Sequence, residues 1–213
     1  FAARMPERMV EVGIAEQNLV GVAAGLAAGG RRVIAVSPAS FLATRSLEQI
    51  KNDVCYSDRP VILVGISAGV SYGALGSTHH SLHDFAALRG IHNITVVAPA
   101  DNWEAREALR AVLAAGSPVY IRFGKKPLPD LPHRGEFSLG KGRIIREGSD
   151  GAFVATGETV WRALAAAQAL SETGASVAVV SMHTIKPLDA ELVCALGRSV
   201  GAVVAVEEHS EHG

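Results

Sequence analysis

VEVGIAEQNLVGVAAGLAAGG, residues 10–30, is the stretch from which the fold is predicted. The alternation of apolar and polar residues at 9–12 predicts a short strand, Gly13 a turn, and the small apolar residues after Gln17 a helix. A carboxylate, Glu16, stands where this helix begins. Because α/β folds bind ligands where parallel strands end and helices begin, the stretch predicts an α/β fold and a candidate site.

Two interpretations of Glu16 are open from the residues alone. As a carboxylate at a helix N-terminus it would satisfy free backbone N–H groups and the helix dipole. As an acid in an apolar turn it would be desolvated, which would raise its pKa and suit it to share a proton with a basic ring nitrogen. The glycines Gly21, Gly25 and Gly29 form a smooth ridge on the same helix, which indicates either packing within the chain or a subunit interface.

The composition favours an α/β protein. The 213 residues are 48% hydrophobic and 19% charged, with 22 glycines and only 5% aromatic residues, enough for one large or two modest domains. The net charge of -1 gives no electrostatic reason to expect a nucleic-acid or membrane partner. No apolar run reaches the roughly 18 residues of a membrane span, and the first residues do not resemble a signal peptide, so we expect a cytoplasmic protein.

The two cysteines and the chain ends lead to two further expectations. Cys55 and Cys194 lie far apart within apolar periodic segments, which predicts buried free thiols in a reducing compartment rather than a disulfide. The chain does not start with Met and stops directly after an apolar run, so we treat it as a fragment of a longer protein.

Strand and helix patterns alternate along the whole chain. In the first part we predict strands at 33–36, 61–66, 94–98 and 118–122 and helices at 46–56, 80–89 and 101–115, the last capped by Asp101 with Glu104 in a capping box. After a proline-rich linker at 125–141, we predict strands at 152–156, 177–181 and 202–206 and helices at 160–172 and 188–196. This order predicts two mainly parallel sheets, in a domain at 1–124 that lacks its first elements and a truncated domain at 142–213.

Four side chains are candidates for chemistry at the carboxyl edge of the first sheet. Besides Glu16, Phe41 is either a core residue or a face for a flat ring, and His79 is either a capping residue or a substrate contact. Arg122 ends a strand and could bind phosphate or pair with a neighbouring acid. The loop before His79 lacks both the P-loop lysine and the G-x-G-x-x-G spacing, and we find no cluster of metal ligands.

The motifs of this chain resemble the pyrimidine-binding and C-terminal domains of transketolases. The chain is most similar to the separately encoded C-terminal subunit of split bacterial transketolases. The motifs that carry the resemblance are Pro6-Glu7-Arg8, VGIAEQN at 12–18, GVAAGLA at 21–27, GSTHH at 76–80, ALRGI at 87–91, VAPAD at 97–101, GKGR at 140–143, EGSD at 147–150, SM at 181–182, KPLD at 186–189 and EEH at 207–209.

The resemblance implies a role for each candidate residue. Glu16 would hydrogen-bond a ring nitrogen of the pyrimidine of thiamine diphosphate and favour the tautomer that takes the proton from the thiazolium carbon. Ile14 would line the same pocket, and Phe41 would stack on the ring. His79 would contact the sugar near the reacting carbons, and Arg122 would bind a sugar phosphate.

The resemblance also implies a partner and a reaction. A large N-terminal subunit would bind the diphosphate and supply most of the ligands of Mg²⁺ or another divalent ion. Two copies of each chain would form an α2β2 heterotetramer. The enzyme would transfer a two-carbon ketol unit from a ketose or ketose phosphate to an aldehyde. Two alternatives stay open: an activity like that of deoxyxylulose-phosphate synthase, and a structural or regulatory subunit without turnover.

The chain departs from the transketolase pattern where substrates would be recognised. Ala74 and Leu75 stand where transketolases usually have an acidic pair, and Ser77 replaces a proline. Ser67 stands where a histidine is often found, and Pro38 where a second pocket phenylalanine often occurs. We therefore expect cofactor activation to be kept and the recognition of the sugar phosphate to differ.

Overall fold

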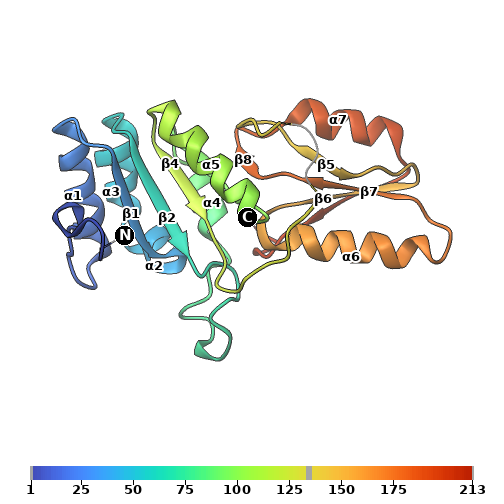
Figure 1. Cartoon of the computed structure of the whole chain (residues 1–213), viewed down its shortest axis with the longest axis horizontal. Helices are drawn as coiled ribbons and strands as arrows, with labels where there is room; N and C mark the ends of the chain where they lie inside the picture. Colours follow the sequence, from blue (N-terminus) through green and yellow to red (C-terminus); the bar gives the residue numbers. More distant parts are fainter. Residues whose placement is uncertain (1, 133–135, 213) are drawn as a thin grey trace.

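Two sheets organise the chain, and each lies at the centre of its own α/β unit (Figure 1). The computed structural model describes residues 2–132 and 136–212. The strand order is β1-β2-β4-β3-β8 in the first sheet and β5-β7-β6-β9 in the second. Most neighbouring strands are parallel, while β8 and β5 are antiparallel to their partners. The α/β class with mainly parallel sheets is confirmed.

The first unit holds most of the chain. Its strands are β1 (Val33–Pro38), β2 (Val61–Ile66), β3 (Thr95–Val97) and β4 (Val119–Arg122). Its helices are η1 (Pro6–Arg8), α1 (Glu16–Ala28), α2 (Ala39–Arg45), α3 (Leu47–Gln49), the π-helix η2 (Ile50–Tyr56), η3 (Gly73–Leu75), α4 (Asp84–Arg89) and α5 (Asn102–Ala115).

The second unit follows the predicted linker, of which residues 133–135 lie outside the described residues. Its strands are β5 (Arg143–Arg146), β6 (Gly151–Ala155), β7 (Val177–Ser181) and β9 (Val203–Val206), and its helices are η4 (Gly157–Thr159), α6 (Val160–Ser171) and α7 (Ala190–Ser199). The strand β8 (Thr184–Lys186) comes from this part of the chain but pairs with β3 of the first sheet. The two units therefore share backbone pairing.

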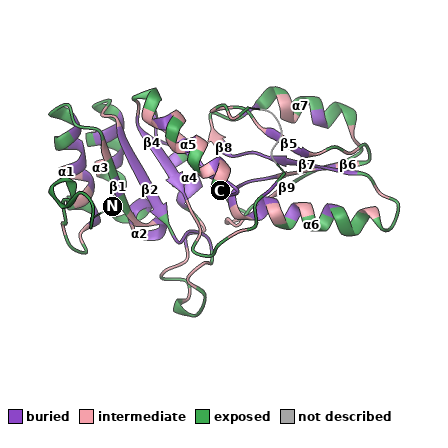
Figure 2. Cartoon of the chain, viewed as in Figure 1, coloured by how far each residue is buried: buried purple, intermediate pink, exposed green. Residues whose placement is uncertain are grey.

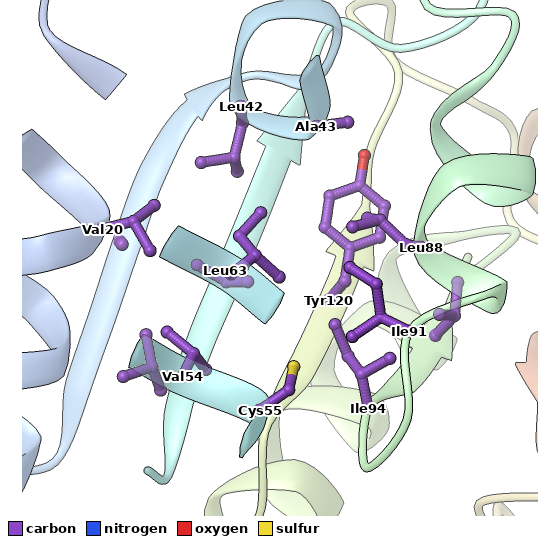
Figure 3. Close-up of a cluster of buried hydrophobic side chains, with 14 of the residues drawn as sticks. Val20, Leu42, Ala43, Val54, Cys55, Leu63, Leu88, Ile91, Ile94 and Tyr120 are labelled. Atoms are coloured by element: carbon purple, nitrogen blue, oxygen red, sulfur yellow. The ribbon is translucent and has the colours of Figure 1, made fainter. Parts of the chain in front are cut away.

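Side chains of the central strands are buried on both faces, as a parallel sheet covered by helices requires. In β2, Leu63 packs with Val54 and Tyr120 under α1, α2 and η2 (Figure 3), whereas Ile62 and Val64 pack under α5. In the second unit α6 and α7 cover opposite faces of the sheet (Figure 1). Figure 2 shows the resulting pattern, with buried central strands and with helices exposed on their outer sides, whereas the edge strand β9 is largely exposed.

A buried ion pair joins the two units. Asp101 caps α5 as predicted, since its carboxylate accepts a hydrogen bond from the Glu104 N–H at 2.8 Å. The Glu104 carboxylate accepts the N–H of Ala100 at 2.8 Å and the hydroxyl of Ser181 at 3.0 Å. Arg143, the first residue of β5, donates to it at 2.5 Å. A motif expected to serve one helix therefore ties α5 to the second sheet.

Some local predictions are wrong. Residues 9–12 form no strand; Met9 and Val10 are 47% and 54% exposed, and no neighbouring strand pairs with them. The helix predicted at 80–89 begins only at Asp84, so His80 and His83 precede it. Both errors come from short patterns. A short segment forms a strand or a helical turn only when a neighbouring element pairs with it or packs on it.

Two apolar periodic segments also differ from expectation. The segment 46–56 is helical, as predicted, but a π-helix forms its second half. Leu47 is 37% exposed, whereas Ile50 and Val54 are buried. Both cysteines are free, as predicted, but only Cys55 is buried. Cys194 is exposed on α7, so its predicted burial is wrong. No helix in the described part of the chain is both long and apolar enough to cross a membrane.

Candidate functional site

Glu16 is the first residue of α1, and its carboxylate is held by two residues of neighbouring elements. Ser37 at the end of β1 donates to Oε1 at 3.2 Å, and Nη1 of Arg45 on α2 donates to Oε2 at 2.9 Å. Glu16 is only 4% exposed, whereas the side chain of Arg45 is 50% exposed. A buried acid therefore lies at the carboxyl edge of the sheet, and its ionic partner can reach solvent.

The environment of Glu16 differs from the one that we predicted. Burial raises the pKa of Glu16, but the hydrogen bonds and the charge of Arg45, with smaller help from its own backbone and from Ser37, outweigh burial and leave that pKa lowered. The prediction of a raised pKa is therefore wrong for the chain by itself. The carboxylate is therefore ionised at neutral pH, and Arg45 supplies the largest of the contributions that lower its pKa.

Phe41 and His79 come together next to this ion pair. Phe41 lies on α2 rather than in a loop, one helical turn before Arg45, and the Arg45 guanidinium lies 4.5 Å from its ring centre. The His79 ring meets the Phe41 ring edge-on at 5.3 Å. A second ring, that of Tyr72, meets His79 from another direction, also at 5.3 Å. The structure thus brings Glu16, Phe41 and His79 into one cluster, as their common sheet edge predicts.

Three members of this cluster, Arg45, Tyr72 and Ser37, were not predicted from the sequence. Arg45 could have been found from its position four residues after Phe41, because residues at this spacing meet on a helix. Tyr72 lies in the loop before His79, which contains Gly69, Gly73 and Gly76. Nζ of Lys125 lies 4.5 Å from the centre of its ring. Ser37 gives no signal in the sequence, since its contact with Glu16 depends on how α1 packs on β1.

Ile14 and the glycine ridge lie at the surface. Ile14 is 91% exposed, just before α1. A Cβ added at Gly21 or Gly25 would meet no described atom within 4 Å. The ridge therefore does not pack within the described part of the chain, and a subunit interface stays a prediction.

Arg122 is in a different environment from the other candidates. Its Nε lies 3.1 Å from Oδ2 of Asp84, and its Nη2 donates to the backbone carbonyls of Ser81 and Glu208. Arg122 therefore pairs with a neighbouring acid, Asp84, which was the alternative to phosphate binding predicted from the sequence. Arg122 also lines a small cavity with Ala68 and Gly124. No hydrogen bond of its Nη1 is seen among the described residues.

The loop that departs from the transketolase pattern is open to solvent. Ala74 and Leu75 form η3, where both are exposed. Ser67, by contrast, is 6% exposed and has a positive φ of 55°. The substitutions therefore change an accessible rim as well as one buried position beside β2.

The residues present suit one half of a thiamine diphosphate site. An ionised, buried carboxylate beside a half-buried phenyl ring and an exposed isoleucine can accept a hydrogen bond from a flat ring and cover its faces. Within residues 2–132 and 136–212, no group of three His, Cys, Asp or Glu side chains is placed to hold a metal ion. The pyrimidine end of the cofactor fits this cluster, and the diphosphate–metal end has no matching group in the described chain.

Comparison with known proteins identifies both halves of the chain. Residues 1–130 match the family described as transketolase, pyrimidine binding domain, and residues 140–213 match transketolase, C-terminal domain. The chain is 43% identical to one subunit of the apulose-4-phosphate transketolase of Phocaeicola vulgatus, over 100% of this chain and 69% of that protein. It is 40% identical to 1-deoxy-D-xylulose-5-phosphate synthase 1 of Geobacter metallireducens, over 100% of this chain and 34% of that protein.

The fold is also that of a solved relative. A split gene transketolase, in the form called an inactive beta4 tetramer, has a TM-score of 0.89 and 38% sequence identity to this chain. The match covers 98% of this chain and 68% of the solved one.

Proposed function

The chain belongs to the transketolase family, and from this we propose that it is the small subunit of a two-component transketolase that uses thiamine diphosphate. In this proposal the enzyme transfers a two-carbon ketol unit from a ketose or ketose phosphate to an aldehyde. The observation that carries the proposal is the buried carboxylate of Glu16 beside Phe41 and His79 at the carboxyl edge of a parallel sheet.

Each residue of the cluster has a proposed task. Thiamine diphosphate, when bound, supplies the carbon nucleophile that carries the two-carbon unit. Glu16 holds a proton between its carboxylate and the nearest pyrimidine ring nitrogen, a role that requires Arg45 to release one carboxylate oxygen. Phe41 offers an apolar face to the ring, and Ile14 covers its rim. His79, fixed between Phe41 and Tyr72, hydrogen-bonds the sugar near the reacting carbons.

Arg122 is proposed to hold the anionic end of the substrate. Burial and three fixed contacts keep its guanidinium in one orientation while Nη1 has no bond among the described residues. The name of the Phocaeicola vulgatus relative includes a 4-phosphate, which supports a phosphorylated substrate.

A partner subunit completes the proposed enzyme. We propose that a large N-terminal subunit supplies the diphosphate and Mg²⁺ contacts and that two copies of each chain form an α2β2 heterotetramer. The open ridge at Gly21 and Gly25 supports a contact between chains on α1. The solved relative in an inactive beta4 form supports self-association of this subunit without turnover.

The central test is Glu16→Gln in the enzyme reconstituted from both subunits with thiamine diphosphate and Mg²⁺. Gln keeps the size of the side chain but cannot share a proton in the same way, so kcat should fall by about 10²- to 10⁴-fold. Light scattering should show unchanged assembly. Glu48→Gln, at an exposed position on α3, is the matched control and should keep full activity. Full activity of Glu16→Gln would contradict the proposal.

The second candidate function is condensation of pyruvate with an aldehyde. The 40% identity to a 1-deoxy-D-xylulose-5-phosphate synthase favours it, although that relative carries the matching region as 34% of a longer protein. The same reconstituted enzyme distinguishes the two. Release of CO₂ from pyruvate with an aldehyde acceptor, in the absence of turnover with any ketose donor, would favour the synthase activity over ketol transfer.

A further inference from the structure

A buried cluster of polar side chains lies where the end of the chain meets the first sheet. We call Asp84, Tyr120, Arg122 and His209 the junction cluster. The Tyr120 hydroxyl donates to Oδ2 of Asp84 at 2.7 Å, and Nε of Arg122 lies 3.1 Å from the same oxygen. Nε2 of His209 lies 3.9 Å from the other oxygen, Oδ1. All four side chains are at most 7% exposed.

The segment after β9 supplies one of the three polar contacts of Arg122 and packs on its neighbours. The carbonyl of Glu208 accepts a hydrogen bond from Nη2 of Arg122 at 2.9 Å, and the N–H of Ser210 donates to the carbonyl of Leu82 at 2.8 Å. The His209 ring stacks on Phe85 at 5.3 Å, and the Arg122 guanidinium lies 4.4 Å from the same phenyl ring. The orientation of Arg122 therefore depends on both units of the chain.

Three polar atoms of the junction cluster have no hydrogen bond within the described residues. Nε of Arg122 is one of them and is held by its ion pair with Asp84, whereas the other two, Oδ1 of Asp84 and Nε2 of His209, face each other at 3.9 Å. Buried polar groups are nearly always paired, because an unpaired group loses its hydration without compensation. At 3.9 Å the two atoms lie just beyond hydrogen-bond distance, so a small shift of either side chain would pair them.

We propose that His209 is a positioning residue, through which the C-terminal domain fixes Asp84 and Arg122 and thereby sets the affinity of the site for an anionic substrate group. This inference rests on the proposed role of Arg122. It assigns to the second unit, which contributes nothing to the cluster around Glu16, a function in substrate recognition. In the structure Asp84 acts as the intermediary, since it contacts both His209 and Arg122.

The test compares two aldehyde acceptors in the reconstituted enzyme, glyceraldehyde 3-phosphate and unphosphorylated glyceraldehyde. His209→Ala should raise KM for the phosphorylated acceptor by about two- to tenfold, the equivalent of one hydrogen bond, and leave kcat and the other KM unchanged. His209→Gln, which restores a nitrogen near the position of Nε2, should recover part of the loss. His212→Ala, three residues further on with a largely exposed side chain, is the matched control and should change neither KM.

A second variant covers the case in which His209→Ala fails to fold. Tyr120→Phe removes only the hydroxyl that holds Asp84 and should produce the same selective rise in KM. An equal change of KM for both acceptors in these variants, or no change in a folded His209→Ala, would overturn the inference. Arg122→Met separates the two proposals. If it raises KM selectively and His209→Ala does not, only the inference fails; if Arg122→Met has no selective effect, the proposed role of Arg122 fails and the inference fails with it.

Discussion

At the residue scale, the buried carboxylates of Glu16 and Glu104 each face an arginine, but the two arginines differ in their exposure to solvent. Glu16 faces a half-exposed arginine, and its pKa is lowered. Glu104 faces a buried arginine, and burial outweighs the hydrogen bonds and the charge of Arg143, so its pKa is raised. An acid whose ionic partner can move into solvent can change its protonation when a ligand arrives. This contrast supports the proposal that Glu16 has a chemical role, whereas Glu104 has a structural one.

Arg45→Met should therefore raise the pKa of Glu16. The variant removes the hydrogen bond and the charge of Arg45, which both lower this pKa, and keeps burial, which raises it. The lowered pKa stabilises the folded wild-type chain above the unfolded value of about 4.5, and this stabilisation is lost as pH falls through the folded value. In Arg45→Met, the free energy of unfolding should therefore fall less steeply as pH is lowered below about 4.5.

The measurement is a titration of the Glu Cδ signals by NMR on the isolated chain, together with urea unfolding at several pH values below 5. Arg32→Met, at an exposed arginine just before β1, is the control and should leave the Glu16 titration unchanged. An unchanged Glu16 titration in Arg45→Met would show that the ion pair does not set this pKa.

At the scale of elements, the loop from β2 to α4 carries His79 and is held at its base by the second unit. Gly69 bonds to Ser81 across this base in both directions. The side chain of Glu208 packs on the backbone of Gly69, where an added Cβ would lie 1.8 Å from its Oε2. Gly69 and Gly73 have similar positive φ angles, 60° and 57°, but a Cβ at Gly73 would meet no described atom within 4 Å. Substitutions at the two positions therefore differ only in the steric contact with Glu208 and not in backbone strain.

Gly69→Ala should destabilise the chain more than Gly73→Ala. Both substitutions introduce a side chain at positive φ, at a cost of about 1–2 kcal/mol, but only the first must displace Glu208. Thermal unfolding monitored by circular dichroism measures the difference. The double variant Gly69→Ala/Glu208→Ala should return to the stability of Gly73→Ala. Equal midpoints for the two single variants would contradict the close packing of Glu208 on the loop.

At the scale of the whole molecule, the two units are joined by polar contacts, by β8 and by limited apolar packing. Ala100 of the first unit packs in the apolar cluster of the second, and Ile185 of β8 packs against the cluster of the first. Across the junction, Arg143 pairs with Glu104, and the segment after β9 pairs with Arg122. Buried charges of this kind fix a relative orientation, because a slight displacement would leave them without partners.

Arg143→Met should destabilise the chain strongly, by about 3–5 kcal/mol, because it leaves Glu104 buried without its partner. The double variant Arg143→Met/Glu104→Gln should recover a large part of this loss, since no charge then remains buried. Urea unfolding of the isolated chain gives both values. Lys141→Met, two residues earlier in an exposed ion pair with Glu191, is the control and should have little effect. A cost of Arg143→Met as small as that of Lys141→Met would disprove a stabilising role for the buried pair.

Features that depend on neighbouring residues could be predicted from the amino-acid pattern. The alternation of strands and helices, the Asp101 cap and the place of Glu16 at a helix start all follow from local periodicity and helix-end chemistry. The common sheet edge of Glu16, Phe41 and His79 follows too, because parallel strands bring their carboxyl ends together. Local patterns failed where a segment needed a distant partner, as at 9–12.

Only the tertiary structure decided the contacts between residues far apart in the chain. Glu16 meets Arg45 across 29 positions, which reverses the direction expected for its pKa. Arg122 meets Glu208 across 86 positions, and β8 leaves its own unit to pair with β3. Such contacts arise from the packing of whole elements, and the energy of a buried charge depends on which partner that packing brings within a few ångströms.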